Sequence, residues 1–118
     1  MTVNEEDRQA AIAADVEQAA RSLAHSTRNV PKPSQSYSLL GELHEITSHL
    51  SQVARQLASW HGRVTDGVEY QGEDERGDGP TGTVSAAANL QDAAAALDAA
   101  TRALMKAHSA NGVIRWNQ

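Results

Sequence analysis

The chain contains no cysteine and no phenylalanine, and aromatic residues make up only 3% of its 118 residues. Without cysteine there are no disulfides, thiolate metal ligands or cysteine nucleophiles, and this composition fits a cytoplasmic protein. A core without phenylalanine must be built from Leu, Val, Ile and the abundant Ala, a set that favours closely packed helices over sheets. We therefore expect an all-α protein that folds as a single domain over residues 1–118.

Long apolar runs are also missing from the sequence. No stretch approaches the ~18 residues that a membrane-spanning helix needs, so we expect no membrane contact. The acidic segment from Met1 to Asp7 has neither the basic nor the apolar region of a signal peptide. The expected location is the cytoplasm.

Positive charge is scarce, and the net charge of −5 has a local origin. Six acidic residues and one basic residue lie between Asp66 and Asp78. The rest of the chain has equal numbers of acidic and basic residues. Nucleic-acid binding through a basic face is therefore disfavoured. Arg outnumbers Lys eight to two, which together with the abundance of Ala indicates a high-GC bacterium or one of its phages or plasmids.

Large apolar residues recur in the middle of the chain with alternating spacings of four and three. They are Leu39, Leu43, Ile46, Leu50, Val53, Leu57, Trp60 and Val64. This heptad pattern is typical of a helix that lies lengthwise against other helices. It predicts a helix over about residues 35–63 that is buried along its whole length.

Two further helices are predicted, over about 4–28 and 84–109. The first has a capping box of Thr2 and Glu5 and ends before Pro31. The last follows Thr83 or Ser85 as its N-cap, carries leucine every seven residues, and stops near residues 111–112. The expected fold is an antiparallel three-helix bundle with coiled-coil-like packing, in which a long acidic, Gly-rich loop over 65–83 joins the second and third helices.

Three segments are expected to bind a partner, which is either another protein or a second copy. A semi-apolar line beside the heptad pattern is the expected homodimer interface, and consists of Leu40, Thr47, Ala54 and His61. The acidic loop contributes Asp66, Glu69, Tyr70, Glu73, Asp74, Glu75 and Asp78, although a solvated linker would have the same composition. The apolar tail over 112–118 contributes Ile114 and Trp116, unless it folds back over a bundle end.

Metal binding has few candidates. His44, Glu45 and His49 resemble the H-E-x-x-H motif of zincin proteases, but the histidines are five residues apart and diverge by roughly 140° on a helix. That motif is therefore rejected. Four side chains with carboxylate or imidazole groups remain as candidate metal ligands. They are Glu42, Glu45, His49 and Asp92. Neither a catalytic residue nor a cofactor is predicted.

Two segments have the pattern Arg-x5-His, Arg55 to His61 and Arg102 to His108. This resembles the Arg-x4–6-His signature of HEPN-type ribonucleases, which are small all-α dimers. The resemblance implies that Arg and His of two subunits would flank an RNA phosphate. In the second segment, Arg102 to His108, the arginine is followed by Ala103, where that family usually has a polar residue.

A second resemblance involves Glu42 and Glu45 on the predicted middle helix and Asn89 and Asp92 on the last one. Their order is similar to the paired E-x-x-E and E-x-x-D motifs of all-α nucleotide pyrophosphohydrolases. In that family carboxylates from two helices hold Mg²⁺ against a triphosphate. Here Asn89 replaces the first acid of the second motif, which implies at most a degenerate relative.

The sequence as a whole favours a non-enzymatic protein–protein interaction or oligomerisation module. Its most informative residues serve helix packing, and the acidic loop and the tail are left for a partner. The two enzyme resemblances remain as alternatives.

Overall fold

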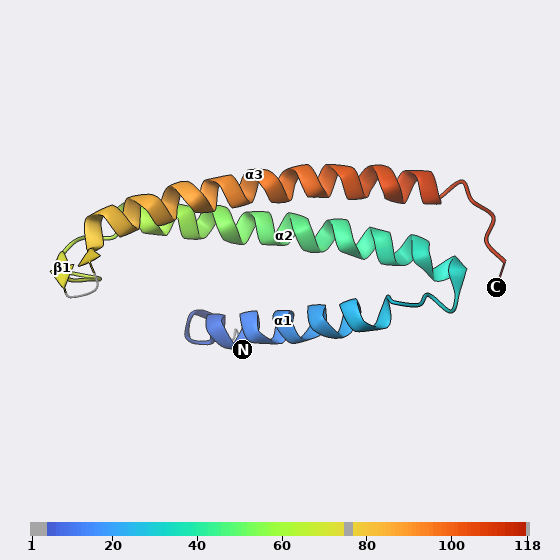
Figure 1. Ribbon diagram of the computed structural model, residues 1–118, viewed down its shortest axis with the longest axis horizontal. Helices are drawn as coiled ribbons and strands as arrows, with labels where there is room; N and C mark the ends of the chain where they lie inside the picture. Colours follow the sequence, from blue (N-terminus) through green and yellow to red (C-terminus); the bar gives the residue numbers. More distant parts are fainter. Residues whose placement is uncertain (1–4, 75–76, 118) are drawn as a thin grey trace. The chain divides into compact units, whose positions relative to one another are not determined.

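The computed structural model describes residues 5–74 and 77–117, and these residues are predominantly helical (Figure 1). They separate into two compact units, one over residues 36–115 and one that contains residues 5–35 together with 116 and 117. The all-α prediction is confirmed. None of the helices in the described ranges is both long and apolar enough to span a bilayer.

The first unit consists of a single-turn 3-10 helix, Glu5–Arg8, followed by α1, Gln9–Ser26, and a second 3-10 turn, Pro33–Gln35. Arg21 and Glu17 form an exposed i,i+4 ion pair at 2.6 Å. The helix ends at Thr27, whose amide and hydroxyl both donate to the carbonyl oxygen of Leu23. No residue of α1 is buried. The predicted capping residue Thr2 lies outside the described residues.

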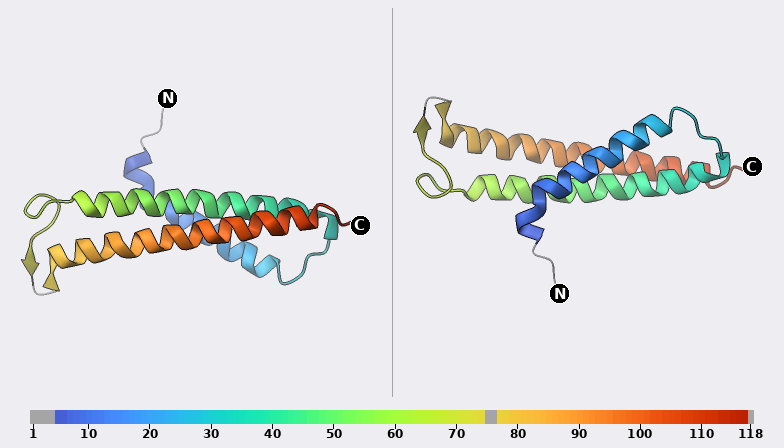
Figure 2. Two further views of the ribbon diagram at one scale, coloured as in Figure 1. Left: turned by 90° about the horizontal axis from the view of Figure 1, so that it is seen from above. Right: turned by 90° about the horizontal axis from the view of Figure 1, so that it is seen from below.

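The second unit is a hairpin of two long helices, α2, Ser36–Arg63, and α3, Gly79–Asn111. The two helices lie side by side in all views (Figures 1 and 2). They run antiparallel, because side-chain hydrogen bonds join Ser36 to Asn111 and Thr47 to Thr101. Each helix is roughly 40–50 Å long at 1.5 Å per residue.

The connection between α2 and α3 is shorter and more structured than expected. The third helix begins at Gly79, five residues before the predicted start near 84, so residues 79–83 of the expected loop are helical. Its N-cap is Asp78, and not Thr83 or Ser85. Within the connection, β1, Glu73–Asp74, pairs antiparallel with β2, Gly77–Asp78. This two-residue ladder lies at the end of the hairpin, away from any core.

The side chain of Asp78 caps the N-terminus of α3. One of its carboxylate oxygens accepts from the backbone N–H of Thr81 at 3.5 Å, and the other accepts from the hydroxyl of Thr81 at 2.7 Å. Pro80 lies in the first turn, where its missing N–H removes no helical hydrogen bond. The helix therefore extends through glycines that would otherwise favour a loop.

Candidate interaction surface

The buried residues of the α2–α3 hairpin have mainly small side chains. The buried residues of the hairpin are Ser51, Ala54, Ala58, Ala94 and Asn111. Ser51 and Ala94 are each only 1% exposed. Small residues let the two helix backbones approach closely, so the contact stabilises the hairpin through close packing more than through the area of large apolar side chains.

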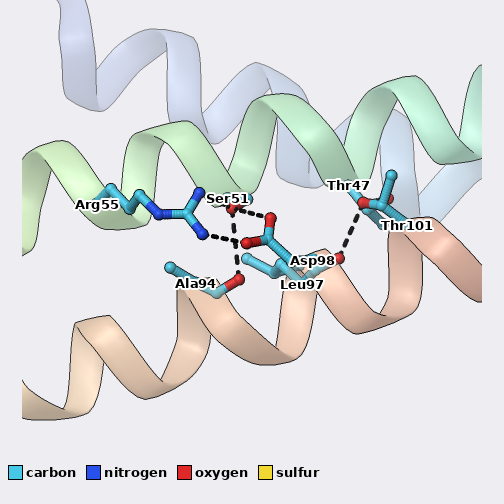
Figure 3. A network of polar contacts seen from close by, with 7 residues as sticks. All are labelled: Thr47, Ser51, Arg55, Ala94, Leu97, Asp98 and Thr101. Atoms are coloured by element: carbon cyan, nitrogen blue, oxygen red, sulfur yellow. Dashed lines mark hydrogen bonds and ion pairs between the residues drawn. The ribbon is translucent and has the colours of Figure 1, made fainter.

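A polar network crosses this contact at its centre (Figure 3). Ser51 Oγ donates to Asp98 Oδ1 at 2.6 Å and lies 3.4 Å from the carbonyl oxygen of Ala94. Arg55 donates to Ser51 Oγ at 2.6 Å and forms an ion pair with the second oxygen of Asp98. One turn along, the hydroxyls of Thr47 and Thr101 are 2.6 Å apart.

The network changes the titration of Asp98. Hydrogen bonds from Arg55 and Ser51 favour the ionised carboxylate and hold the pKa of Asp98 below its ordinary value of 3.8. The charges of Arg55 and Arg102 act in the same direction. Asp98 is therefore ionised at neutral pH and pairs with Arg55 across the contact.

The central heptad residues of α2 are not buried against α3. The apolar stripe, as we name it, consists of Leu39, Leu43, Ile46, Leu50, Val53, Leu57, Trp60 and Val64. Its five central members, from Ile46 to Trp60, are between 38% and 48% exposed. The expectation that the middle helix is buried along its whole length is therefore not met within the hairpin of α2 and α3.

The physical reason is a rotation of α2 by one residue. Ser51, Ala54 and Ala58 are buried, and each directly follows a member of the apolar stripe, Leu50, Val53 or Leu57. Successive residues are about 100° apart around an α-helix. The stripe therefore lies roughly a quarter turn away from α3, on an open side of the hairpin.

Part of the flank that we expect to form a homodimer contacts α3 within the chain. Ala54 is buried in the α2–α3 contact, and Thr47 shares its hydrogen bond with Thr101. Leu40 and His61 are half-buried, and His61 Nδ1 lies 2.7 Å from the carbonyl oxygen of Leu57. The central residues of the apolar stripe are more exposed than this flank.

The acidic connection is held by local contacts. Glu69 accepts from the backbone N–H of Thr65 at 2.6 Å, and the Gly67 amide donates to the Tyr70 carbonyl oxygen at 2.7 Å. Gly67 has a φ of +86°, a conformation that glycine adopts without strain. Among the other predicted partner-binding residues, Asp66 is exposed. Glu75 lies outside the described residues, as do the side chains of Glu73 and Asp74.

An open hollow of about 470 Å³ lies where the connection meets the hairpin. Trp60 and Val64 of the apolar stripe line one side, and Tyr70 and Asp78 of the connection line another. The hollow therefore continues the stripe at one end. At the other end of the chain, Ile114 and Trp116 are 47% and 41% exposed.

The opposite end of the hairpin contains an aromatic cluster that sequence reasoning missed. The rings of Tyr37 and His108 stack with centroids 4.0 Å apart, and the ring of His44 lies 5.3 Å from that of His108. A Cβ on Gly41 would lie 3.2 Å from His108 Nε2, so the glycine leaves room for the imidazole. Only the pairing of α2 with α3 reveals this cluster.

The metal candidates do not converge. Glu45 lies 3.7 Å from His44 Nδ1 and 4.0 Å from His49 Nε2, on an exposed side of α2. Because residue 47 is level with residue 101, Asp92 is level with about residue 56, roughly 16 Å along α2 from Glu45. Glu42 is exposed. Within residues 5–74 and 77–117, no three His, Asp or Glu side chains are placed to hold a metal ion.

The two Arg-x5-His segments lie at opposite ends of the hairpin. Arg55 is engaged by Asp98 and Ser51, and His61 lies edge-on to Trp60 at 4.9 Å. His108 is stacked on Tyr37. The arrangement therefore does not bring the arginine and histidine pairs to one site within a chain.

Comparison of the chain with protein-family models, with curated proteins and with solved structures gave no match.

Proposed function

We propose that this protein is a non-enzymatic protein–protein interaction module whose binding surface is the apolar stripe of α2. The observation that carries the proposal is the exposure of five large side chains in a continuous heptad pattern, with Leu50 38% exposed and Trp60 44% exposed. Such a pattern is typical of a helix that packs lengthwise against a further helix. The proposed partner surface is therefore an amphipathic helix, from a second copy or from another protein.

The energy available from this surface is substantial. Complete burial of a large aliphatic side chain contributes about 1.5–3 kcal/mol. Covering the exposed two fifths of the five side chains from Ile46 to Trp60 would contribute about 3–6 kcal/mol for each copy of the stripe.

The polar groups support a binding role over catalysis. Arg55 and Asp98, the two charged groups closest to the centre of the hairpin, are paired with each other. His108 is stacked on Tyr37, and Asn89 donates to the carbonyl oxygen of Ser85 four residues earlier. These contacts occupy Arg55, His108 and Asn89, three of the side chains that carry the enzyme resemblances.

The antiparallel three-helix bundle stays a prediction within this proposal. It would require α1 to cover a face of the hairpin with its own apolar residues Ile12, Val16 and Leu23. A cytoplasmic setting in a high-GC bacterium, phage or plasmid also stays a prediction, as does the use of the acidic connection and of the tail in partner binding.

The test replaces two members of the stripe with glutamate, Leu50→Glu together with Leu57→Glu. We expect the hairpin to keep its helical content, measured by far-UV circular dichroism, and to lose association with itself or with any captured partner. The matched control places glutamate at two exposed polar positions of the same helix, Gln52→Glu and Ser59→Glu. Association that persists in the stripe variant would refute the proposal, and loss of helical content there would mean that the stripe is part of the folded core.

A further inference from the structure

We propose that the apolar stripe pairs with the same stripe of a second copy, and that the two α2 helices run antiparallel. This inference rests on the proposed function, because it names the occupant of the same surface. The evidence is the charge on the side chains that border the stripe.

The stripe has the same spacing when read in either direction. In an antiparallel pair centred between residues 51 and 52, Leu50 of one copy meets Val53 of the other, and Leu43 meets Trp60. The remaining layers pair Ile46 with Leu57 and Leu39 with Val64. Each layer therefore contains one residue from each half of the helix, and the bulky Trp60 falls opposite a leucine, and not opposite itself.

The flank away from α3 carries Glu42, His49, Gln56 and Arg63, and all four side chains are exposed. In an antiparallel coiled coil, this flank of one helix faces the same flank of the other. When the pair is centred between residues 51 and 52, Glu42 of each copy lies beside Arg63 of the other copy, and His49 lies beside Gln56. Both ends of the interface gain a pair of opposite charges.

Glu42 and Arg63 cannot form an ion pair within one chain. Glu42 and Arg63 are about 32 Å apart along α2. In the structure the guanidinium of Arg63 donates to Ser59 Oγ at 3.1 Å, four residues earlier, and remains exposed. Only a second helix in the antiparallel orientation brings these two charges together.

A parallel pair lacks this complementarity. It would place the flank with Glu42 and Arg63 beside the flank with Thr47 and Ala54, which are occupied by α3. It would also set Trp60 against Trp60. The charge pattern and the separation of the two Trp60 side chains both favour the antiparallel arrangement.

The experiment is a charge exchange measured by sedimentation equilibrium at low salt. Glu42→Arg alone, and Arg63→Glu alone, each place like charges at both ends of the interface. We expect each to raise the dimer dissociation constant about tenfold, because two attractive surface pairs become repulsive. The double variant Glu42→Arg with Arg63→Glu restores opposite charges, so its dissociation constant should return to that of the wild type.

The matched control is Glu45→Arg, which makes the same change of charge on α2 one turn away, outside the flank. Its dissociation constant should stay within about twofold of the wild type. A second measurement uses the absence of native cysteine. An oxidised mixture of His49→Cys and Gln56→Cys chains should form the mixed disulfide in preference to either symmetric one.

The possible failures are distinguishable. A monomeric wild type, or a double variant as weak as its parents, would overturn antiparallel self-pairing. If Leu50→Glu with Leu57→Glu still removed binding to another protein, the proposed function would stand without self-pairing. If that stripe variant left every association unchanged, both proposals would fail.

Discussion

Replacing Ala94 with leucine tests whether the α2–α3 contact is formed by the small-residue side of α2. Ala94 is 1% exposed, and its carbonyl oxygen lies 3.4 Å from Ser51 Oγ on the facing helix. A leucine at this position adds three carbon atoms to space that α2 already fills. The helices must then separate or rotate, which weakens the hydrogen bonds at the centre of the hairpin.

The expected loss follows from the close packing of this contact. Added carbon atoms in a filled contact typically cost about 1–3 kcal/mol of unfolding free energy. For a domain of this size, each kcal/mol lowers the melting temperature by roughly 4–8 °C. The control is Ala96→Leu, an exposed position two residues along α3. Leucine and alanine have similar helix propensities, so this variant should stay within about 0.5 kcal/mol of the wild type.

The assay is urea unfolding followed by far-UV circular dichroism, at one low protein concentration so that self-association does not contribute. Equal slopes with a lower midpoint for Ala94→Leu would show a loss of stability in an unchanged fold. The reasoning is refuted if Ala94→Leu is as stable as Ala96→Leu. In that case α3 would contact α2 through another face, and the apolar stripe would be the first candidate.

Three other predictions concern the polar network and the start of α3. Because Arg55 holds the pKa of Asp98 below 3.8, the Asp98 contribution to stability is present above that pH and is lost as the pH falls through the lower folded-state value. Asp98→Asn should therefore lower the melting temperature at neutral pH, and the difference from wild type should shrink in strong acid. Asp78→Ala removes the N-cap of α3 and should cost about 1 kcal/mol in urea unfolding. Gly79→Ala would put a Cβ 2.7 Å from the Tyr70 ring, and should cost about 1–3 kcal/mol by calorimetry.

The sequence indicated the helices well, and the start of α3 less well, for a local reason. The two prolines before α2 mark its beginning, and the structure starts that helix at Ser36. Before α3, glycines at 77, 79 and 82 favour a loop by composition. Asp78 with Pro80 is nevertheless a start signal, since an aspartate cap can be followed by a proline in the first turn. The start of α3 is therefore decided by the Asp78 cap and Pro80, although the glycine content favours a loop.

Contacts distant in sequence were less predictable. The four-residue spacing of Asp98 and Arg102 on one helix favours an ion pair within α3, but the structure pairs Asp98 with Arg55 of α2. Which arginine reaches the carboxylate depends on how far α3 is shifted along α2. One residue of shift displaces a side chain by about 1.5 Å along the axis and 100° around it. Periodicity within one helix does not contain that information.

Periodicity within one helix also does not show which of its lines of residues faces the neighbouring helix, so the orientation of α2 was not predictable. That orientation strengthens the case for a binding surface. Two neighbouring lines of this helix have heptad spacing, the apolar stripe and the line of small and polar residues that includes Ser51, Ala54 and Ala58. An Ala-rich α3 packs most closely on the line of small residues, since no large side chain holds the backbones apart. That choice leaves the line with the most apolar area uncovered. A heptad pattern indicates that a face is buried in the final assembly, and because α3 does not bury this one, we propose that a further helix does.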